Sequence, residues 1–179
     1  MTISEYAELA QRTASTKTKS QKIGHGCLGL IGEAGEVVDI LKKERYMSMP
    51  YELAREKLID ECGDLVWYSV ELCTGLGMEF EEVYNQANIY DKICDTSIGA
   101  MMNVLLIVVD AYQFDSIAKA KRRLGFYTVS EILANIIFLL NNYHITFEEV
   151  INFNIDKLSK RYPEHIFNAD RSNERYAQK

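Results

Sequence analysis

The amino-acid sequence predicts an all-α protein, and three observations support that fold class. No segment shows the strict alternation of apolar and polar residues that is typical of a half-buried strand. A capping-box pattern, Thr followed three residues later by Glu, occurs at Thr2, Thr128 and Thr146, and this pattern marks the start of a helix. Both prolines, Pro50 and Pro163, lie where a helix can end or a loop can begin, so neither interrupts a helix.

The expected helices are placed by these capping boxes and by glycines. The Thr2 box opens the first helix, and the polar, Ser/Thr-rich residues 13–22 are expected to form a loop after it. Gly75 and Gly77 end the third helix, because glycine favours the left-handed conformation found after helix ends. The last two helices begin at the other two boxes. In order, the expected helices cover residues 2–13, 27–46, 51–76, 79–93, 97–111, 129–143 and 147–161.

Composition and charge exclude several classes of protein. Hydrophobic residues make up 47% of the chain and charged residues 26%, which is ordinary for a globular protein. The formal net charge of −6 argues against a nucleic-acid partner, and it would also repel a nucleotide unless metal ions invert the charge locally. The apolar run at 132–140 is too short to cross a membrane.

Cysteine usage and the N-terminus predict a cytoplasmic protein. The N-terminal residues 1–11 lack the basic and apolar regions of a secretion signal. The cysteines form no C-x-x-C pair and fall inside apolar helical runs, so we expect buried free thiols, which fit a reducing compartment. These cysteines are Cys27, Cys62, Cys73 and Cys94.

The chain contains an internal repeat with an offset of 67 residues. The segment 80–83, Phe-Glu-Glu-Val, recurs at 147–150, and the Ile-Gly pair at 31–32 recurs at 98–99. We therefore predict two tandem, divergent halves, followed by a polar tail, with bounds 1–95, 96–164 and 165–179. Chance similarity between amphipathic helices is the alternative explanation.

Two acidic pairs, Glu33-x-x-Glu36 and Glu61-x-x-Asp64, are the candidate metal ligands. Residues three apart lie on one helix face, so the two carboxylates of each pair can bind one ion together. Both helices are apolar around much of their girth, which predicts burial, and buried carboxylates need neutralisation. No lysine cluster is evident nearby in the sequence, so a divalent cation is the expected counter-charge. Oxygen ligands favour Mg²⁺, with Mn²⁺ as a substitute.

The second half loses most of this acidic set. At an offset of 67 residues, Glu33 and Glu36 correspond to Ala100 and Asn103, and Glu61 corresponds to Thr128. The last carboxylate, Asp64, corresponds to Glu131. The second half is therefore expected to be a structural partner that lacks a metal site.

These motifs resemble the MazG-type, all-α nucleoside triphosphate pyrophosphohydrolases. The resemblance rests on Glu33-Ala-Gly-Glu36 followed by Glu61-x-Gly-Asp64-x-x-Trp67-Tyr, and on Lys157 to Glu164 near the C-terminus. It implies Mg²⁺-dependent cleavage of an NTP or dNTP to the monophosphate and pyrophosphate, in nucleotide-pool cleaning. It also implies that all four acidic residues are metal ligands. We favour Glu36 as the carboxylate that also activates water.

The resemblance also suggests contacts to the substrate. Four basic residues are candidates for phosphate contacts, although each is equally well explained as a solvated helix end: Lys42, Lys92, Lys157 and Arg161. Trp67 could stack on a base, and packing in the core is its alternative role. In this family, helices from two or more chains build the pocket. The second half is therefore expected to replace a partner protomer, giving a fused pseudo-dimer that could pair further as a homodimer.

Several other functions fit the same residues. A dimeric-type dUTPase or dCTPase, or a phosphoribosyl-ATP pyrophosphatase, would be a related enzyme. A non-catalytic helical protein that binds a nucleotide or a partner is the alternative from a different class. The intact acidic set argues against a protein that has lost its catalytic function. The equivalent positions of the second half, Ala100 and Asn103, show that these carboxylates can be lost within this chain.

Overall fold

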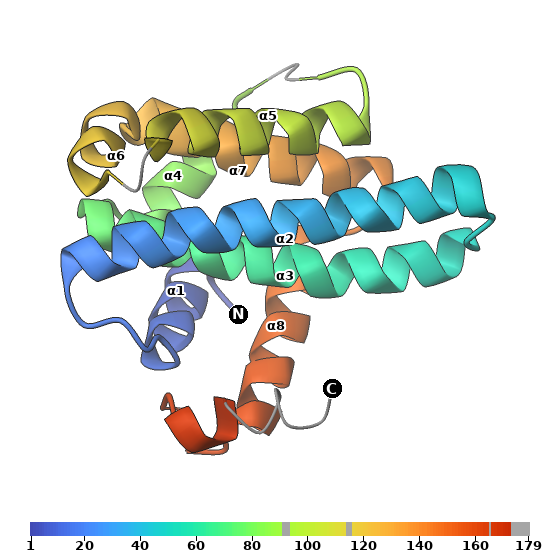
Figure 1. The fold of residues 1–179 in the computed structure, drawn as a ribbon. Coiled ribbons are helices and arrows are strands. Elements are labelled where there is room, and N and C mark those ends of the chain that lie inside the picture. The colour runs from blue at the N-terminus through green and yellow to red at the C-terminus, as the bar shows by residue number, and fades with distance from the viewer. Residues whose placement is uncertain (91–93, 114–115, 165, 173–179) are drawn as a thin grey trace.

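The computed structural model describes residues 1–90, 94–113, 116–164 and 166–172, and all regular structure in these residues is helical. The predicted all-α fold class is therefore confirmed. The helices labelled in Figure 1 are α1 (Ile3–Arg12), α2 (Lys19–Met47), α3 (Tyr51–Leu76), α4 (Phe80–Ala87), α5 (Ser97–Ala111), α6 (Ile117–Arg123), α7 (Phe126–Asn142) and α8 (Phe147–Arg161).

Capping boxes start three of these helices. Those at Thr2 and Thr146 are present as predicted, with reciprocal hydrogen bonds between the cap and the residue three positions later. A further box joins Thr18 and Gln21 and starts α2 directly after Thr18. The predicted loop over 13–22 is therefore wrong beyond Thr18. The first turn of α2 is polar and its box is closed by Gln rather than Glu, so neither signal used for the other helices marked this start.

Other predicted bounds also need correction. Helix α7 begins at Phe126 with Gly125 as its cap, so Thr128 lies in the first turn and does not cap the helix. Phe126 packs against the core, and this tertiary contact outweighs the local capping pattern. The short basic helix α6 was not predicted. Helix α4 ends at Ala87, and residues 91–93 of the longer predicted helix lie outside the described residues.

Helices α2 and α3 form a long antiparallel pair at the centre of the molecule, with α5 and α7 on one side and α1 and α8 on the other (Figure 1). The terminal helix of each predicted half crosses to the opposite half. Helix α8 packs on α3, and α4 packs on α7. Buried residues from both segments, 1–95 and 96–164, contribute to one hydrophobic core.

Helices α3 and α7 end in the same way. Each is followed by a residue with positive φ, Gly77 (77°) after α3 and His144 (52°) after α7, and these positions are 67 residues apart. Each end is closed by a hydrogen bond from the next backbone N–H, and the two bonds are Met78 to Cys73 (2.9 Å) and Ile145 to Leu140 (3.0 Å). This is the Schellman arrangement of a helix C-terminus.

The described part of the C-terminal tail folds back on the first helix. The backbone N–H of Phe167 donates to the carbonyl of Arg12 at 3.2 Å, and the Phe167 ring lies 5.8 Å from that of Tyr162. Among the described residues, no single helix is long and apolar enough to cross a membrane, and the one pair that reaches such length and composition together, α6 and α7, is bent by 84°.

Candidate metal centre

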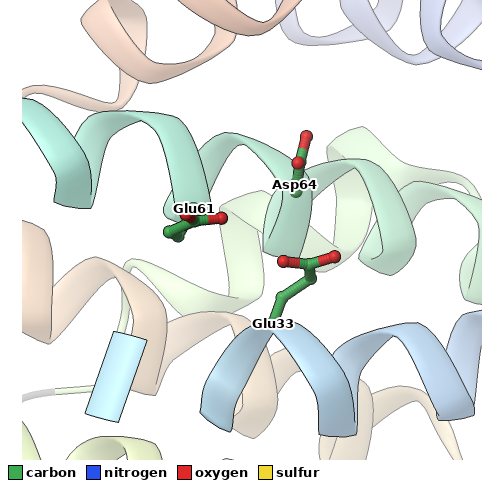
Figure 2. Close-up of side chains that lie close together, drawn as sticks. All are labelled: Glu33, Glu61 and Asp64. Carbon is green, nitrogen blue, oxygen red and sulfur yellow. The ribbon is translucent and has the colours of Figure 1, made fainter. Parts of the chain in front are cut away.

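Three of the four predicted carboxylates meet between α2 and α3. Glu33 extends from α2 towards α3, which carries Glu61 and Asp64 one turn apart (Figure 2). One carboxylate oxygen from each of the three lies within 4.8 Å of the others. We call these residues the acidic triad. The triad joins two helices into one cluster of oxygen ligands, which suits a hard divalent cation.

The fourth carboxylate, Glu36, lies one turn further along α2 and is exposed to solvent. It does not belong to the triad, but it lines a pocket together with Glu61. Its negative charge also contributes to raising the pKa values of Glu33 and Glu61. Glu36 therefore lies beside the cluster, where it is open to water.

Burial and mutual repulsion keep these carboxylates from ionising freely. Burial, followed by the charges of Asp64, Glu36 and Glu61, raises the pKa of Glu33 to about 8. Burial likewise raises the pKa of Glu61, followed by the charges of Glu36 and of two aspartates, Asp60 and Asp64. No hydrogen bond to Glu33 or Glu61 is found in the described part of the chain. A bound cation would stabilise the ionised forms of both.

Lys157 corrects one prediction about this site. Its ammonium donates to Asp60 at 2.5 Å and to Asp64 at 2.8 Å, so a lysine distant in the sequence, predicted only as a phosphate contact, supplies part of the counter-charge that was assigned to a cation. Burial acts to lower the pKa of Lys157, but Asp64 and Asp60 outweigh it and raise the pKa. Lys157 lies 93 residues after Asp64, so only the packing of α8 on α3 reveals the contact.

Asp64 is also held by a buried amide from the same helix, α8. Asn154 is fully buried, donates to Asp64 at 3.0 Å and accepts from the Tyr6 hydroxyl at 3.1 Å. The glycine of the Glu-x-Gly-Asp motif allows this approach, because a Cβ on Gly63 would lie 3.1 Å from the Cβ of Asn154. The motif therefore encodes both a carboxylate of the acidic triad and the space for the helix that orients it.

The acidic residues face two pockets. The first, of about 350 Å³, contains Glu33 and Asp64 and is otherwise rich in rings. We call it the aromatic pocket, and it is lined by Thr13, Ser15, His25, Glu33, Asp64, Trp67, Tyr68, Leu158, Arg161, Tyr162, Phe167 and Ser172. The second, of about 420 Å³, is the lysine pocket, and it is lined by Gly32, Gly35, Glu36, Asp39, Ile40, Lys43, Met49, Lys57 and Glu61.

The glycines around the first acidic pair leave room in the lysine pocket. A Cβ on Gly32 or on Gly35 would meet no atom within 4 Å. Among the described residues, no backbone of another element approaches either position, so the space is open to a ligand. Lys43 and Lys57 line this pocket but were not among the predicted substrate contacts.

The predicted substrate contacts lie in different environments. Arg161 and Trp67 both line the aromatic pocket. The Trp67 side chain is largely buried, and its Nε1–H donates to Ala10 O and Thr13 Oγ1, each at 3.1 Å. Lys42 is exposed and lines neither pocket, but it is paired with Asp39, which lines the lysine pocket. The remaining candidate, Lys92, lies outside the described residues.

Sequence reasoning missed a histidine–carboxylate pair at the far end of the aromatic pocket. The Nδ1 atom of His25 lies 2.5 Å from a carboxylate oxygen of Glu71, which is fully buried. The available signal was the isolation of Glu71, which is the lone Asp, Glu, Lys or Arg between Asp64 and Glu79. A single acidic residue in such an apolar run calls for a buried partner.

Comparison of the chain with known protein families, curated proteins and solved structures found no match. The chemistry of the centre must therefore be argued from its own residues. These residues fit a divalent cation: the donors are all oxygen, they come from two facing helices, and they repel one another unless a cation is shared.

Proposed function

We propose that this protein hydrolyses a nucleoside triphosphate to the monophosphate and pyrophosphate in a Mg²⁺-dependent reaction, as in nucleotide-pool cleaning. The observation that carries the proposal is the acidic triad between α2 and α3, with an aromatic pocket on one side and a lysine pocket on the other. A nucleotide has a planar base at one end and an anionic chain at the other. The resemblance of the acidic motifs to MazG-type enzymes supports the same reaction.

Glu33, Glu61 and Asp64 would hold the metal, with Mn²⁺ as a possible substitute for Mg²⁺. The metal would neutralise phosphate charge and so allow an anionic substrate to enter a protein of net charge −6. Lys157 and Asn154 hold Asp64 in place from α8. The chain thus supplies both the ligands and the contacts that orient one of them.

The protein's own groups suggest how the bond between the α- and β-phosphates is broken. The oxygen of a water molecule attacks the α-phosphorus, and the bond from that phosphorus to the bridging oxygen of the β-phosphate breaks. Glu36 accepts the proton released by the water, which fits its exposed position beside the triad. The leaving pyrophosphate carries away the bridging oxygen and its electron pair. Lys57 in the lysine pocket favours this anion, and Lys43, which is paired with Asp39 at 2.5 Å, lines the same pocket.

We further propose that the fold is a fused pseudo-dimer made of two divergent MazG-like repeats. The exchanged packing of α4 and α8, and the equivalent ends of α3 and α7, support this origin. The second half replaces the carboxylate pair with neutral contacts. There, Asn103 donates to Asn135 at 3.3 Å, and Ala100 is buried.

A nucleotide panel tests the proposed reaction. Purified protein is incubated with each NTP and dNTP plus Mg²⁺ or Mn²⁺, and monophosphate and pyrophosphate are quantified separately. We expect equimolar monophosphate and pyrophosphate, with activity abolished in Glu33→Gln. The matched control is Glu131→Gln, which alters an acidic residue of the second half and should retain activity. A dUTPase or dCTPase would turn over one pyrimidine dNTP alone, whereas no turnover of any nucleotide would favour a non-catalytic binding protein.

A further inference from the structure

Residues of α2 and α3 face one another in three successive pairs, of which the first belongs to the acidic triad. Glu33 faces Asp64, Gly29 faces Tyr68 and His25 faces Glu71. His25 precedes Glu33 by eight residues, which places it about 12 Å away along the helix axis. The separation between the phosphates and the base of a nucleotide is of this order. His25 therefore lies where the base would be if the phosphates are at the triad.

The middle pair, Gly29 and Tyr68, shapes the aromatic pocket. A Cβ on Gly29 would lie 2.2 Å from ring atoms of Tyr68, so only glycine allows the ring to lie against α2 in this position. The Tyr68 ring meets the His25 ring edge-on at 5.3 Å, and the Trp67 ring meets it edge-on at 6.1 Å. Three rings thus form one wall of the aromatic pocket, and such a wall suits a planar heterocycle.

Glu71 fixes the orientation of His25. The Glu71 carboxylate is fully buried and is bonded to His25 Nδ1 and to the hydroxyl of Thr16. A buried carboxylate needs a counter-charge, and replacing such a pair with apolar residues is often neutral or stabilising. Stability alone therefore does not explain why the pair is present.

One polar atom of the His25 ring, Nε2, remains open to the aromatic pocket. Its side chain is 40% exposed and lines the aromatic pocket, whereas Nδ1 is directed to the buried Glu71. This leaves Nε2 available to a ligand. When the imidazole carries the charge that balances Glu71, both ring nitrogens are donors. The pocket then offers an N–H group and has no imidazole acceptor.

We propose that His25, oriented by Glu71, recognises the base of the nucleotide by donating from Nε2 to a base carbonyl oxygen. The favoured substrates carry uracil, thymine or guanine, and an exocyclic amino group in the same place, as in cytosine or adenine, is rejected. This inference rests on the proposed function. Glu71 is the positioning residue, because it sets which hydrogen-bonding role His25 presents.

The test compares binding and turnover in the wild type and three variants. Binding of α,β-methylene analogues of dUTP, dGTP, dCTP and dATP is measured by calorimetry with Mg²⁺, and kcat and KM are measured with the parent nucleotides. His25→Asn keeps an amide near the Nδ1 position but presents no donor to the pocket. Glu71→Gln removes the charge, so that a neutral His25 can present either a donor or an acceptor. The matched control is His144→Asn, an exposed histidine whose left-handed backbone Asn tolerates.

We expect the wild type to prefer carbonyl bases by about tenfold or more in Kd and KM, the typical weight of one hydrogen bond to a charged donor. In His25→Asn and Glu71→Gln this preference should fall towards one. His144→Asn should keep the preference. Equal losses for all four bases, or a wild type that prefers amino bases, would overturn the inference. Selective binding without any hydrolysis would refute the proposed reaction alone, and absence of both would refute both.

Discussion

Binding of Mg²⁺ to the metal-free protein should release close to one proton at pH 7. The reason is that Glu33 must ionise in order to bind a metal, whereas burial and the neighbouring carboxylates raise its pKa to about 8. With that pKa, about nine-tenths of the Glu33 side chains carry a proton at pH 7, and about one-tenth do so at pH 9. Glu61, whose pKa is also raised, adds to the number released.

The same pKa predicts how affinity and stability change with pH. Below pH 8 the apparent Mg²⁺ affinity should rise by about tenfold per pH unit, because each unit multiplies the ionised fraction of Glu33 by that factor. An unfolded chain loses this proton near the ordinary value of 4.5, whereas the folded chain holds it to about 8. The free energy of unfolding of the metal-free protein should therefore fall as pH rises through this window, and Mg²⁺ should oppose the fall.

Calorimetric titration in buffers of different ionisation enthalpy measures the protons released. The slope of observed enthalpy against buffer enthalpy gives their number directly, at pH 7 and again at pH 9. Glu33→Gln should bind Mg²⁺ more weakly and release few protons, whereas Glu131→Gln should match the wild type. If the wild type binds Mg²⁺ at pH 7 with no proton release, the electrostatic description of the triad is wrong.

Three further changes test how the centre is built. Lys157→Met should lower the stability of the metal-free protein by about 1–2 kcal/mol in urea unfolding, since it leaves Asp64 without its cation, and Mg²⁺ should restore more stability than in the wild type. Gly63→Ala should cost about 1–3 kcal/mol, because its Cβ would press α8 away from α3 at Asn154. Gly29→Ala should displace the Tyr68 ring and weaken nucleotide binding while leaving Mg²⁺ affinity nearly unchanged, and weakened metal binding as well would contradict this.

The sequence predicted the fold class and the residues of the acidic triad because both depend on local patterns. Residues three apart on a helix share a face whatever the tertiary structure, so Glu61 and Asp64 could be paired in advance. Glu33 was grouped with them through the resemblance of both acidic motifs to one family. The capping box at Thr18 could not be predicted from local patterns, because the polar first turn of α2 shows no apolar spacing.

Contacts between distant segments could not be predicted in this way. Lys157 and Asn154 reach Asp64 from about 90 residues away, through an exchange of helices that no local pattern encodes. The pairing of His25 with Glu71 depends in the same way on the packing of α2 against α3. The separation of Glu36 from the triad is also a tertiary effect, since its spacing from Glu33 is that of a ligand pair.

The most direct measurement of the central claim is an anomalous difference map from crystals of the protein soaked in Mn²⁺. We predict one strong peak between α2 and α3, about 2.0–2.3 Å from oxygens of Glu33, Glu61 and Asp64, and its loss in Glu61→Gln. Crystals of Glu131→Gln should keep the peak. A saturating soak that leaves this position empty, with Lys157 still bonded to Asp64, would contradict a metal centre at the acidic triad.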